Sequence, residues 1–246
     1  MSAHLIGIHA VEEALAAGRP LNRIVVARGQ HGGRIQKIVD LARSRGVPVR
    51  FEDRGQMDRS AGSQRHQGVM AFAASRAAVE LEDLLADGSE SQMLVLLDGV
   101  EDPHNVGAIV RTALGAGAAG IVIPERRAAG LTETVSRVSA GALEHLPVAR
   151  VKNMARAMEQ LKEAGYWLVG LDAGAEKIYT EVDYRGRVAI VMGSEGAGLH
   201  ELVRKRCDFV VSIPMSGPVG SLNVSVAAGI VLFEAARQRR GAQQSS

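Results

Sequence analysis

The second half of the chain is built from short, continuously apolar segments that alternate with helical segments. The clearest apolar runs are Met93–Leu97, Val188–Met192 and Val210–Pro214. A strand without polar alternation is buried on both faces, and such strands joined by helices form a parallel sheet covered on both sides. Further strands are expected at 121–124, 147–151 and 167–171, and helices at 106–116, 132–140, 153–164, 199–206 and 222–239. The pattern therefore predicts an α/β domain with a parallel sheet.

The first 75 residues carry a separate and smaller pattern. Strands are expected at 24–27, 47–51 and 68–74, and helices at 9–17 and 35–45. This predicts a small α/β or α+β unit. The acidic stretch Glu80–Ser91 ends in small polar residues, as a connector does. We therefore expect a domain over residues 1–75, a linker over 76–91 and a second domain over 92–246.

Charge is distributed unevenly between these parts. Residues 1–75 hold 11 Lys and Arg against 6 Asp and Glu, a net charge of +5, and the remainder holds 18 against 21, a net charge of −3. A basic front domain suggests a polyanionic partner, although scattered arginines can also simply solvate a surface. Arg54, Arg59, Arg65 and His66 lie on a polar segment that is expected to be a flexible loop, which either contacts phosphates or is a mobile surface loop.

Composition excludes several other classes of protein. No run of about 18 apolar residues is present and the N-terminus lacks the order of a signal peptide, so we expect a soluble, cytoplasmic protein that does not meet a membrane. Cys207 is the single cysteine, which excludes an intrachain disulfide, and its apolar setting favours a core residue over a nucleophile. The seven histidines form no metal-spaced pair, so no metal site is expected.

Polar residues follow three of the expected strands at the point where each strand ends. Asn105 and Arg111 follow the first run, Glu195 lies in GSEGAGL after the second, and Ser221 and Asn223 follow the third. Parallel sheets bind ligands beyond the carboxyl ends of their strands. Ser221 and Asn223 precede a helix, where they can cap it or reach outward to a ligand that its free amides also hold.

One glycine-rich segment has the spacing of a dinucleotide-binding motif. Residues 115–120 read GAGAAG and satisfy GxGxxG. That motif must follow a strand and open a helix, whereas this segment follows a helix and leads into a strand. We interpret Gly115 and Gly117 as helix termination.

Three segments together resemble the signature motifs of the SpoU/TrmH family of RNA ribose 2'-O-methyltransferases, within the SPOUT superfamily. They read LDGVEDPHNVGAIVRTA, VMGSEGAGL and IPMSGPVGSLNVSVAAGI, in the family's order and spacing. The segments GIHAVEEAL and HQGV in the front part further resemble the branch that methylates a guanosine of 23S ribosomal RNA. That branch carries a ribosomal-protein-like RNA-binding domain ahead of its catalytic domain.

The resemblance implies a catalytic domain with a deep C-terminal trefoil knot, which no periodicity argument could show. It implies that S-adenosyl-L-methionine is bound in the knot, largely through main-chain groups. The matching positions are Gly193, Ile213, Met215, Gly217 and Leu222. Glycines there let the backbone lie against the ligand. The resemblance also implies a homodimer formed through the catalytic domain.

The reaction implied is attack of a ribose 2'-hydroxyl on a sulfonium methyl, which needs no metal. The family places Arg111 at that hydroxyl as proton acceptor. A guanidinium with a pKa above about 12 releases its proton at great cost, so we favour a charged Arg111 that binds a phosphate or stabilises the developing alkoxide. Glu195 would orient Arg111 or the ribose. Asn105, Ser221 and Asn223 would hold the ribose and phosphate.

Two alternatives share these features. One is a relative that methylates transfer RNA or another ribosomal site. The other is a non-catalytic RNA-binding factor for ribosome assembly that kept the fold. Methyl transfer to RNA separates the second from an enzyme, and the target is RNA in either case because DNA lacks the 2'-hydroxyl.

Overall fold

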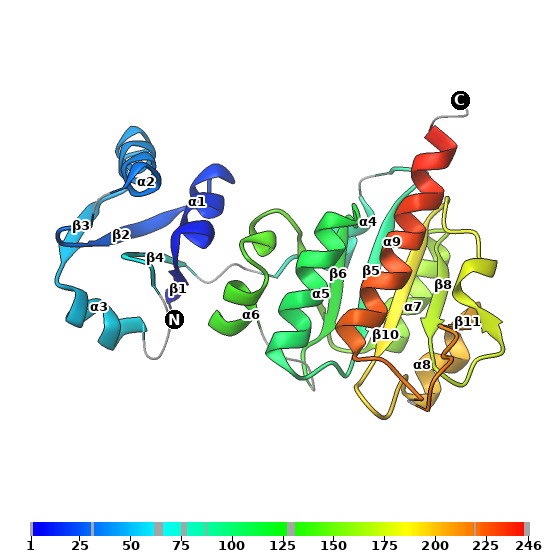
Figure 1. The fold of residues 1–246 in the computed structure, drawn as a ribbon. Coiled ribbons are helices and arrows are strands. Elements are labelled where there is room, and N and C mark those ends of the chain that lie inside the picture. The colour runs from blue at the N-terminus through cyan, green and yellow to red at the C-terminus, as the bar shows by residue number, and fades with distance from the viewer. Residues whose placement is uncertain are drawn as a thin grey trace. The chain divides into compact units, whose positions relative to one another are not determined.

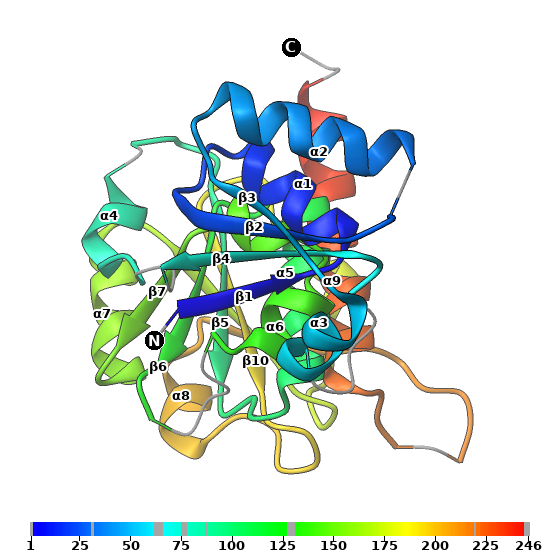
Figure 2. The ribbon, with the colours of Figure 1, turned by 90° about the vertical axis from the view of Figure 1, so that its left-hand side faces the viewer.

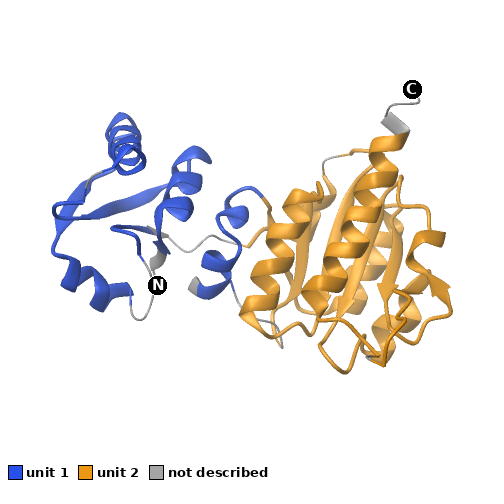
Figure 3. Cartoon of the chain, in the orientation of Figure 1, with its two compact units in different colours: residues 1–77, 131–145 blue, residues 78–130, 146–246 orange. Residues whose placement is uncertain are grey.

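In a computed structural model, the chain divides into two compact units, which are coloured separately in Figure 3. Unit 1 contains residues 1–77 and 131–145, and unit 2 contains residues 78–130 and 146–246. The structure describes residues 2–30, 32–61, 66–74, 78–86, 88–126, 131–218 and 220–243. Within these residues, no helix has the length and apolar content that a bilayer crossing needs.

Unit 1 is built on a four-stranded mixed sheet of order β1-β4-β2-β3, in which only the β2–β3 pair is parallel. The bounds of its elements are β1 Ser2–Ile6, α1 Ile8–Ala16, β2 Leu21–Ala27, α2 Gly33–Ser44, β3 Val49–Glu52, α3 Arg54–Ala61, β4 Val69–Ala74, α6 Glu133–Val138 and the 3-10 helix η1 Ala142–Glu144. Successive strand residues point to opposite faces. Ile24 and Val26 therefore pack with α1 and α2, whereas Val25 packs with Met57 of α3. Helices α1 and α2 lie on one face of the sheet and α3 on the other (Figure 2).

A segment from the middle of the chain completes unit 1. Residues 131–145 pack against the N-terminal elements, with α6 beside β1 and η1 beside α1. Arg19 pairs with Glu144 and both side chains are largely buried, while His145 Nε2 lies 2.7 Å from Glu13 Oε2. Gly141 has a φ of +89°, and a Cβ there would lie 2.6 Å from Cβ and Cγ of Glu13. The sequence pattern predicts the helix of this segment but not the unit to which it belongs.

The expectation of a flexible loop after residue 53 is wrong in part, because residues 54–61 form helix α3. Arg54 and Arg59 are exposed on this helix, and Arg65 lies outside the described residues. His66 differs more: its side chain is only 2% exposed, with Nε2 2.9 Å from Asp58 Oδ1, while Nδ1 accepts from the amide of Gly68 at 3.0 Å. An imidazole held in this way cannot meet a phosphate without leaving its site. We therefore correct the assignment of His66 from RNA contact to a structural role.

Unit 2 contains a parallel sheet of seven strands in the order β7-β6-β5-β10-β8-β11-β9, which confirms the predicted α/β architecture. The bounds of its elements are α4 Leu81–Leu85, β5 Met93–Asp98, α5 Pro103–Gly115, β6 Gly120–Pro124, β7 Val148–Val151, α7 Met154–Glu163, β8 Trp167–Leu171, β9 Lys177–Ile178, the 3-10 helix η2 Tyr179–Glu181, β10 Val188–Gly193, α8 Glu201–Arg206, β11 Phe209–Ser212 and α9 Val224–Gln243. GAGAAG leads from the end of α5 into β6, which is the order expected from the sequence and the reverse of a dinucleotide-binding turn.

Helices cover both faces of this sheet. Leu94 and Leu96 of β5 pack with α4, α7 and α8 in one apolar cluster. Helices α5 and α9 lie side by side over the opposite face (Figure 1). All six residues of β5 and of β10 are buried, which agrees with the apolar runs Met93–Leu97 and Val188–Met192; Asp98 at the end of β5 is a buried acid. The hydrophobic effect on both faces therefore fixes these two strands at the centre of the sheet.

The register of the central strands aligns their carboxyl ends. Gly193 at the end of β10 pairs with Asp98 at the end of β5, and Met192 pairs with Leu171 at the end of β8. The loops that follow these three strands therefore leave the sheet at one edge.

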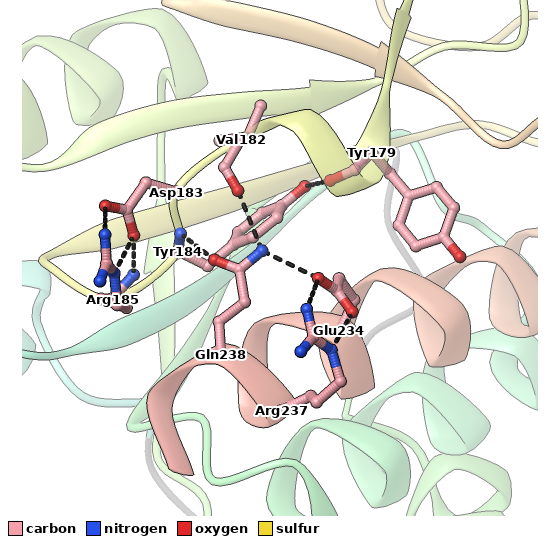
Figure 4. Close-up of polar contacts among 8 residues, drawn as sticks. All are labelled: Tyr179, Val182, Asp183, Tyr184, Arg185, Glu234, Arg237 and Gln238. Carbon is pink, nitrogen blue, oxygen red and sulfur yellow. Dashed lines mark hydrogen bonds and ion pairs between the residues drawn. The ribbon is translucent and has the colours of Figure 1, made fainter. Parts of the chain in front are cut away.

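Helix α9 is anchored at its C-terminal half by Gln238 (Figure 4). Its side-chain Nε2 donates to the carbonyl of Val182 at 3.1 Å, and its Oε1 accepts from the amide of Tyr184 at 3.0 Å. Tyr184 is fully buried, its hydroxyl donates to the carbonyl of Tyr179 at 2.8 Å, and burial raises its pKa. These contacts fix α9 along its axis, so they also fix the residues that precede its first turn.

Cys207 lies at the end of α8, where its thiol donates to the carbonyl of Val203 at 3.4 Å. Burial raises the pKa of this thiol to about 12, with the charge of Asp208 as a second cause. The thiolate is the reactive form, so a rise from 9.0 to about 12 lowers its population about a thousandfold near neutral pH.

We therefore expect Cys207 to resist alkylation by iodoacetamide at pH 8 in the native protein and to react fully in denaturant. The native rate should rise with pH up to about 12, because deprotonation limits it. Mass spectrometry of the labelled peptide measures both rates. Cys207 is partly buried, and labelling at the same rate in both states would show that its surroundings do not suppress the thiolate.

Candidate functional site

Three polar side chains from three separate loops meet at the carboxyl edge of the unit 2 sheet. Asn105 donates its Nδ2 to Glu195 Oε2 at 3.1 Å. Asn223 donates its Nδ2 to Glu195 Oε1 at 3.0 Å and to Asn105 Oδ1 at 3.0 Å. Both oxygens of the Glu195 carboxylate are thus held by amides. We call Asn105, Glu195 and Asn223 the amide–carboxylate cluster.

Local sequence explains how each member is held. Asp102 caps α5 by accepting from the amide of His104 at 2.9 Å, and Pro103 suits the first turn of the helix that carries Asn105. Asn223 lies just before α9 and its Oδ1 accepts from the amide of Ser225 at 3.0 Å. Capping and outward contact, which the sequence left as alternatives for this residue, are therefore both present. Its Oδ1 caps the helix while its Nδ2 joins the cluster.

An open cavity of about 210 Å³ lies next to the cluster. It is bounded by the loops that follow β8, β10 and β11 and by the first turn of α9, and its walls are formed by residues 171–173, 192–198, 213, 215, 220–222, 224 and 227. Gly193, Ile213, Met215 and Leu222 line it as a group, whereas Gly217 does not.

The residues of this cavity fit S-adenosylmethionine. The amides of Met215, Ser221 and Leu222 donate to no acceptor among the described residues, so these donors remain free for a ligand. Aliphatic walls such as Ile213 suit an adenine ring, and the carboxylates of Asp172 and Glu195 suit a cationic ligand. Binding by main-chain donors at a helix start is the mode expected from the sequence.

The loop after β10 depends on glycine for its shape. The amide of Ser194 donates to the carbonyl of Gly198 at 2.9 Å, and the amide of Gly198 donates back at 3.0 Å. Gly196 and Gly198 have φ angles of +87° and +68°. A Cβ at Gly193 would lie 2.1 Å from the carbonyl carbon of Gly198. Close approach and left-handed backbone therefore explain these glycines.

A second cavity, of about 330 Å³, shares Ser194, Glu195 and Val224 with the first. Its remaining walls are residues 99–102, Asn105 and His200. The amide–carboxylate cluster thus lies where the two cavities meet. A cofactor in one cavity and a substrate group in the other would meet at Glu195.

Arg111 and Ser221 stand apart from the cluster. Arg111 is exposed on α5, six residues beyond Asn105, which corresponds to about 9 Å along the axis. Its side chain makes no hydrogen bond or ion pair with any residue that the structure describes. Ser221 is exposed on the cavity wall. The structure therefore brings together three of the five expected catalytic residues and leaves Arg111 free to bind an external group.

Sequence reasoning missed two features of this edge. Asp172 follows β8 and lines the first cavity, where its Oδ2 accepts from Arg204 Nε at 3.1 Å. Asp98 and His200 form a pair at the second cavity. Strand ends were the available signal for both aspartates, since each terminates or follows an apolar run. The described residues contain no group of three or more His, Cys, Asp or Glu side chains suited to a metal ion.

Comparisons with known proteins agree with this geometry. Residues 92–233 match the SpoU rRNA Methylase family, and residues 4–77 match the family of RNA 2'-O ribose methyltransferase substrate-binding domains. The chain is 44% identical over 239 residues, 96% of both chains, to the Bacillus subtilis (strain 168) protein YacO, assigned by name to the TrmH family of tRNA/rRNA methyltransferases.

Solved structures give the same result. The SpoU methyltransferase AviRb from Streptomyces viridochromogenes, in complex with AdoMet, has a TM-score of 0.84 at 27% identity over 98% of this chain and 91% of that one. An AdoMet-bound rRNA methyltransferase from Sinorhizobium meliloti has a TM-score of 0.83 at 28% identity over 96% and 87%. The cofactor expectation is confirmed and a non-catalytic factor is not supported. The chain belongs to the SpoU methylase family and is an S-adenosylmethionine-dependent RNA methyltransferase.

Proposed function

We propose that this enzyme methylates a ribose 2'-hydroxyl in RNA, and that its target is a guanosine of 23S ribosomal RNA. The observation that carries the proposal is the amide–carboxylate cluster at the junction of two cavities. When bound, S-adenosylmethionine supplies a methyl group on a sulfonium, which is already activated. The protein then has to align the hydroxyl and accommodate its proton.

The cluster residues divide this task by their chemistry. In our proposal the Asn105 and Asn223 amides orient Glu195, whose carboxylate faces both cavities and holds the ribose. Ser221 supplies a further hydroxyl at the cofactor cavity. Arg111 has an unengaged guanidinium, which binds a phosphate of the substrate or stabilises the developing alkoxide. Gly193, Ile213, Met215, Gly217 and Leu222 are assigned to the cofactor.

The front domain is assigned to RNA recognition. Residues 1–75 carry a net charge of +5, and Arg54 and Arg59 are exposed on α3. Arginines on a helix surface contact phosphates without reading sequence. We extend the assignment to Arg65 on the same polar segment. Methyl transfer is assigned to the domain over 92–246, and helix α4, which lies within the expected linker 76–91, packs into the core of that domain.

Three further features complete the proposal. The catalytic domain carries a C-terminal trefoil knot, which would place the loop before α9 against the loop after β10. The enzyme is a cytoplasmic homodimer formed through α5 and α9, where Val226 and Phe233 are 51% and 46% exposed on α9. Large exposed apolar side chains on one helix suit a subunit interface. Arg111 on the neighbouring helix would then lie close to the partner subunit.

Methylation mapping tests the target. The purified enzyme is incubated with S-adenosylmethionine and either 23S ribosomal RNA or total transfer RNA, and 2'-O-methylated nucleotides are located by mass spectrometry. We expect a single 2'-O-methylguanosine in 23S RNA. Methylation of transfer RNA alone, a target named for TrmH family relatives such as YacO, would replace the ribosomal assignment. Methylation on a base would contradict the ribose assignment.

Deleting residues 1–75 is expected to abolish methylation of ribosomal RNA while leaving S-adenosylmethionine affinity nearly unchanged, because all lining residues of the cofactor cavity lie in unit 2. Calorimetry measures the affinity and methyl incorporation measures the activity. Because the deletion exposes residues 131–145, the full-length double variant Arg54→Glu/Arg59→Glu serves as a milder test. Equal activity of the truncated enzyme on full-length ribosomal RNA would refute the role of the front domain.

A further inference from the structure

A histidine–aspartate pair borders the second cavity and has no role in the mechanism described above. Asp98 ends β5 and is 6% exposed. Its Oδ2 accepts from the main-chain amide of His200 at 3.0 Å and lies 2.9 Å from Nδ1 of the same residue. Gly99 has a φ of +81°, and a Cβ there would lie 3.0 Å from Cε1 of the ring. The ring is therefore fixed on one edge by Asp98 and packed against the main chain.

This arrangement selects one tautomer of the imidazole. An ionised carboxylate only accepts hydrogen bonds, so Nδ1 of His200 carries the proton. The other nitrogen, Nε2, then keeps a lone pair when the ring is neutral. The His200 side chain is 53% exposed and lines the cavity that also contains Asn105 and Glu195. A base held by a carboxylate and open to the substrate side has the geometry of a general base.

The other charged groups near this cavity are less suited to take a proton. Both oxygens of Glu195 are engaged by amides, and Asp102 caps α5. Glu101 is exposed, and no contact with another described residue holds it in one position. Arg111 has no lone pair to offer. His200 is thus the positioned acceptor among the described residues that line the cavity, and histidine is the side chain that ordinarily titrates near neutral pH.

We propose that His200, oriented by Asp98, accepts the proton of the ribose 2'-hydroxyl during methyl transfer; this rests on the proposed function. The 2'-oxygen forms a bond to the methyl carbon, and the carbon–sulfur bond breaks with its electron pair remaining on sulfur. The 2'-proton passes to Nε2 of His200 and then to water. Arg111 stays charged throughout.

The sign of the pH dependence follows from this role. A base acts only when it is neutral, so the rate should rise with pH until the ring is fully deprotonated and should then become constant. The charged groups around His200 are Asp98 of β5, whose Oδ2 contacts the ring, and Glu101, Asp102 and Glu195, which line the same cavity. On α8, Glu201 pairs with Lys205 and Arg204 with Asp172.

The experiment measures single-turnover methyl transfer from pH 5.5 to 9 for the wild type and for His200→Gln, His200→Ala and Asp98→Asn, with RNA and S-adenosylmethionine saturating. We expect His200→Gln to lower the rate about 10²- to 10⁴-fold and to remove the increase of the rate with pH. Its affinity for the cofactor, measured by calorimetry, should be unchanged. Added imidazole should partly restore His200→Ala. His145→Gln, whose ring pairs with Glu13 in unit 1, is the matched control and should behave as wild type.

A second readout does not depend on activity. Nitrogen-15 NMR of histidine-labelled protein should show His200 with Nδ1 protonated and Nε2 bare, and Asp98→Asn should lose this preference. A His200→Gln enzyme within threefold of the wild-type rate and with its pH profile would overturn the proposal. A raised KM for RNA at unchanged kcat would also overturn it and would make His200 a substrate contact. Failure of the wild type to methylate any RNA ribose would instead refute the proposed function.

Discussion

Replacing Gly193 with alanine is expected to lower the affinity for S-adenosylmethionine about a hundredfold. The added Cβ would lie 2.1 Å from the carbonyl carbon of Gly198, 2.3 Å from its oxygen and 2.4 Å from the amide nitrogen of Leu199. These atoms are main chain, so a side-chain rotation cannot relieve the overlap. Overpacking of this kind costs about 1–3 kcal/mol or more, and about 2.8 kcal/mol corresponds to a hundredfold loss of affinity.

Titration calorimetry with S-adenosylmethionine measures this loss, and circular dichroism checks that the sheet remains folded. Gly186→Ala is the matched control, because a Cβ at that position meets no atom within 4 Å. The control should bind like the wild type. Wild-type affinity for Gly193→Ala would mean that the loop after β10 is not closed on itself as described.

Replacing Arg111 with alanine is expected to lower the methyl-transfer rate about 10²- to 10³-fold, the effect of removing one group that stabilises developing charge. Cofactor affinity should not change, since Arg111 does not line the cofactor cavity. Single-turnover assays at saturating cofactor measure the first quantity and calorimetry the second. Arg111→Lys should retain part of the rate, because lysine keeps the charge but lacks the planar fork of the guanidinium.

Arg156→Ala provides a comparison for Arg111. Arg156 is an exposed arginine on α7, on the opposite face of the same sheet, and should be neutral. Full activity of Arg111→Ala would remove this residue from the reaction. Loss of cofactor binding in the same variant would assign it to the cofactor cavity instead.

The strands of unit 2, and the sheet edge at which the site lies, could be predicted from the local sequence pattern. Apolar runs such as Met93–Leu97 have no polar face that could be exposed to water, so a strand formed by them has to be buried on both faces. Helix α3 shows the opposite case. Its eight residues are mostly polar, and only Met57 and Ala61 are buried. The helix therefore depends on the packing of these two side chains against the sheet, and two apolar residues are too few for a periodic pattern to predict a helix.

Helix α4 was missed for a related reason. Residues 80–86 were interpreted as an acidic connector, but Leu81 and Leu84 are buried in the core of unit 2 and an acidic capping box holds the helix start. Acidic residues at a helix N-terminus stabilise its dipole. The same composition therefore suits a solvated linker and a short docked helix, and burial decides between them.

The sequence by itself determined the parallel sheet, the strand ends that carry Asn105, Glu195 and Asn223, and the unreactive setting of Cys207. These depend on hydrophobic burial and on strand direction, which are local properties of the chain. The tertiary structure alone decided that the three side chains bond one another, that His66 is buried, that residues 131–145 join unit 1, and that Asp98 holds His200. Each of these depends on a contact between residues far apart in sequence, and the spacing of residue types along the chain does not encode such a distance.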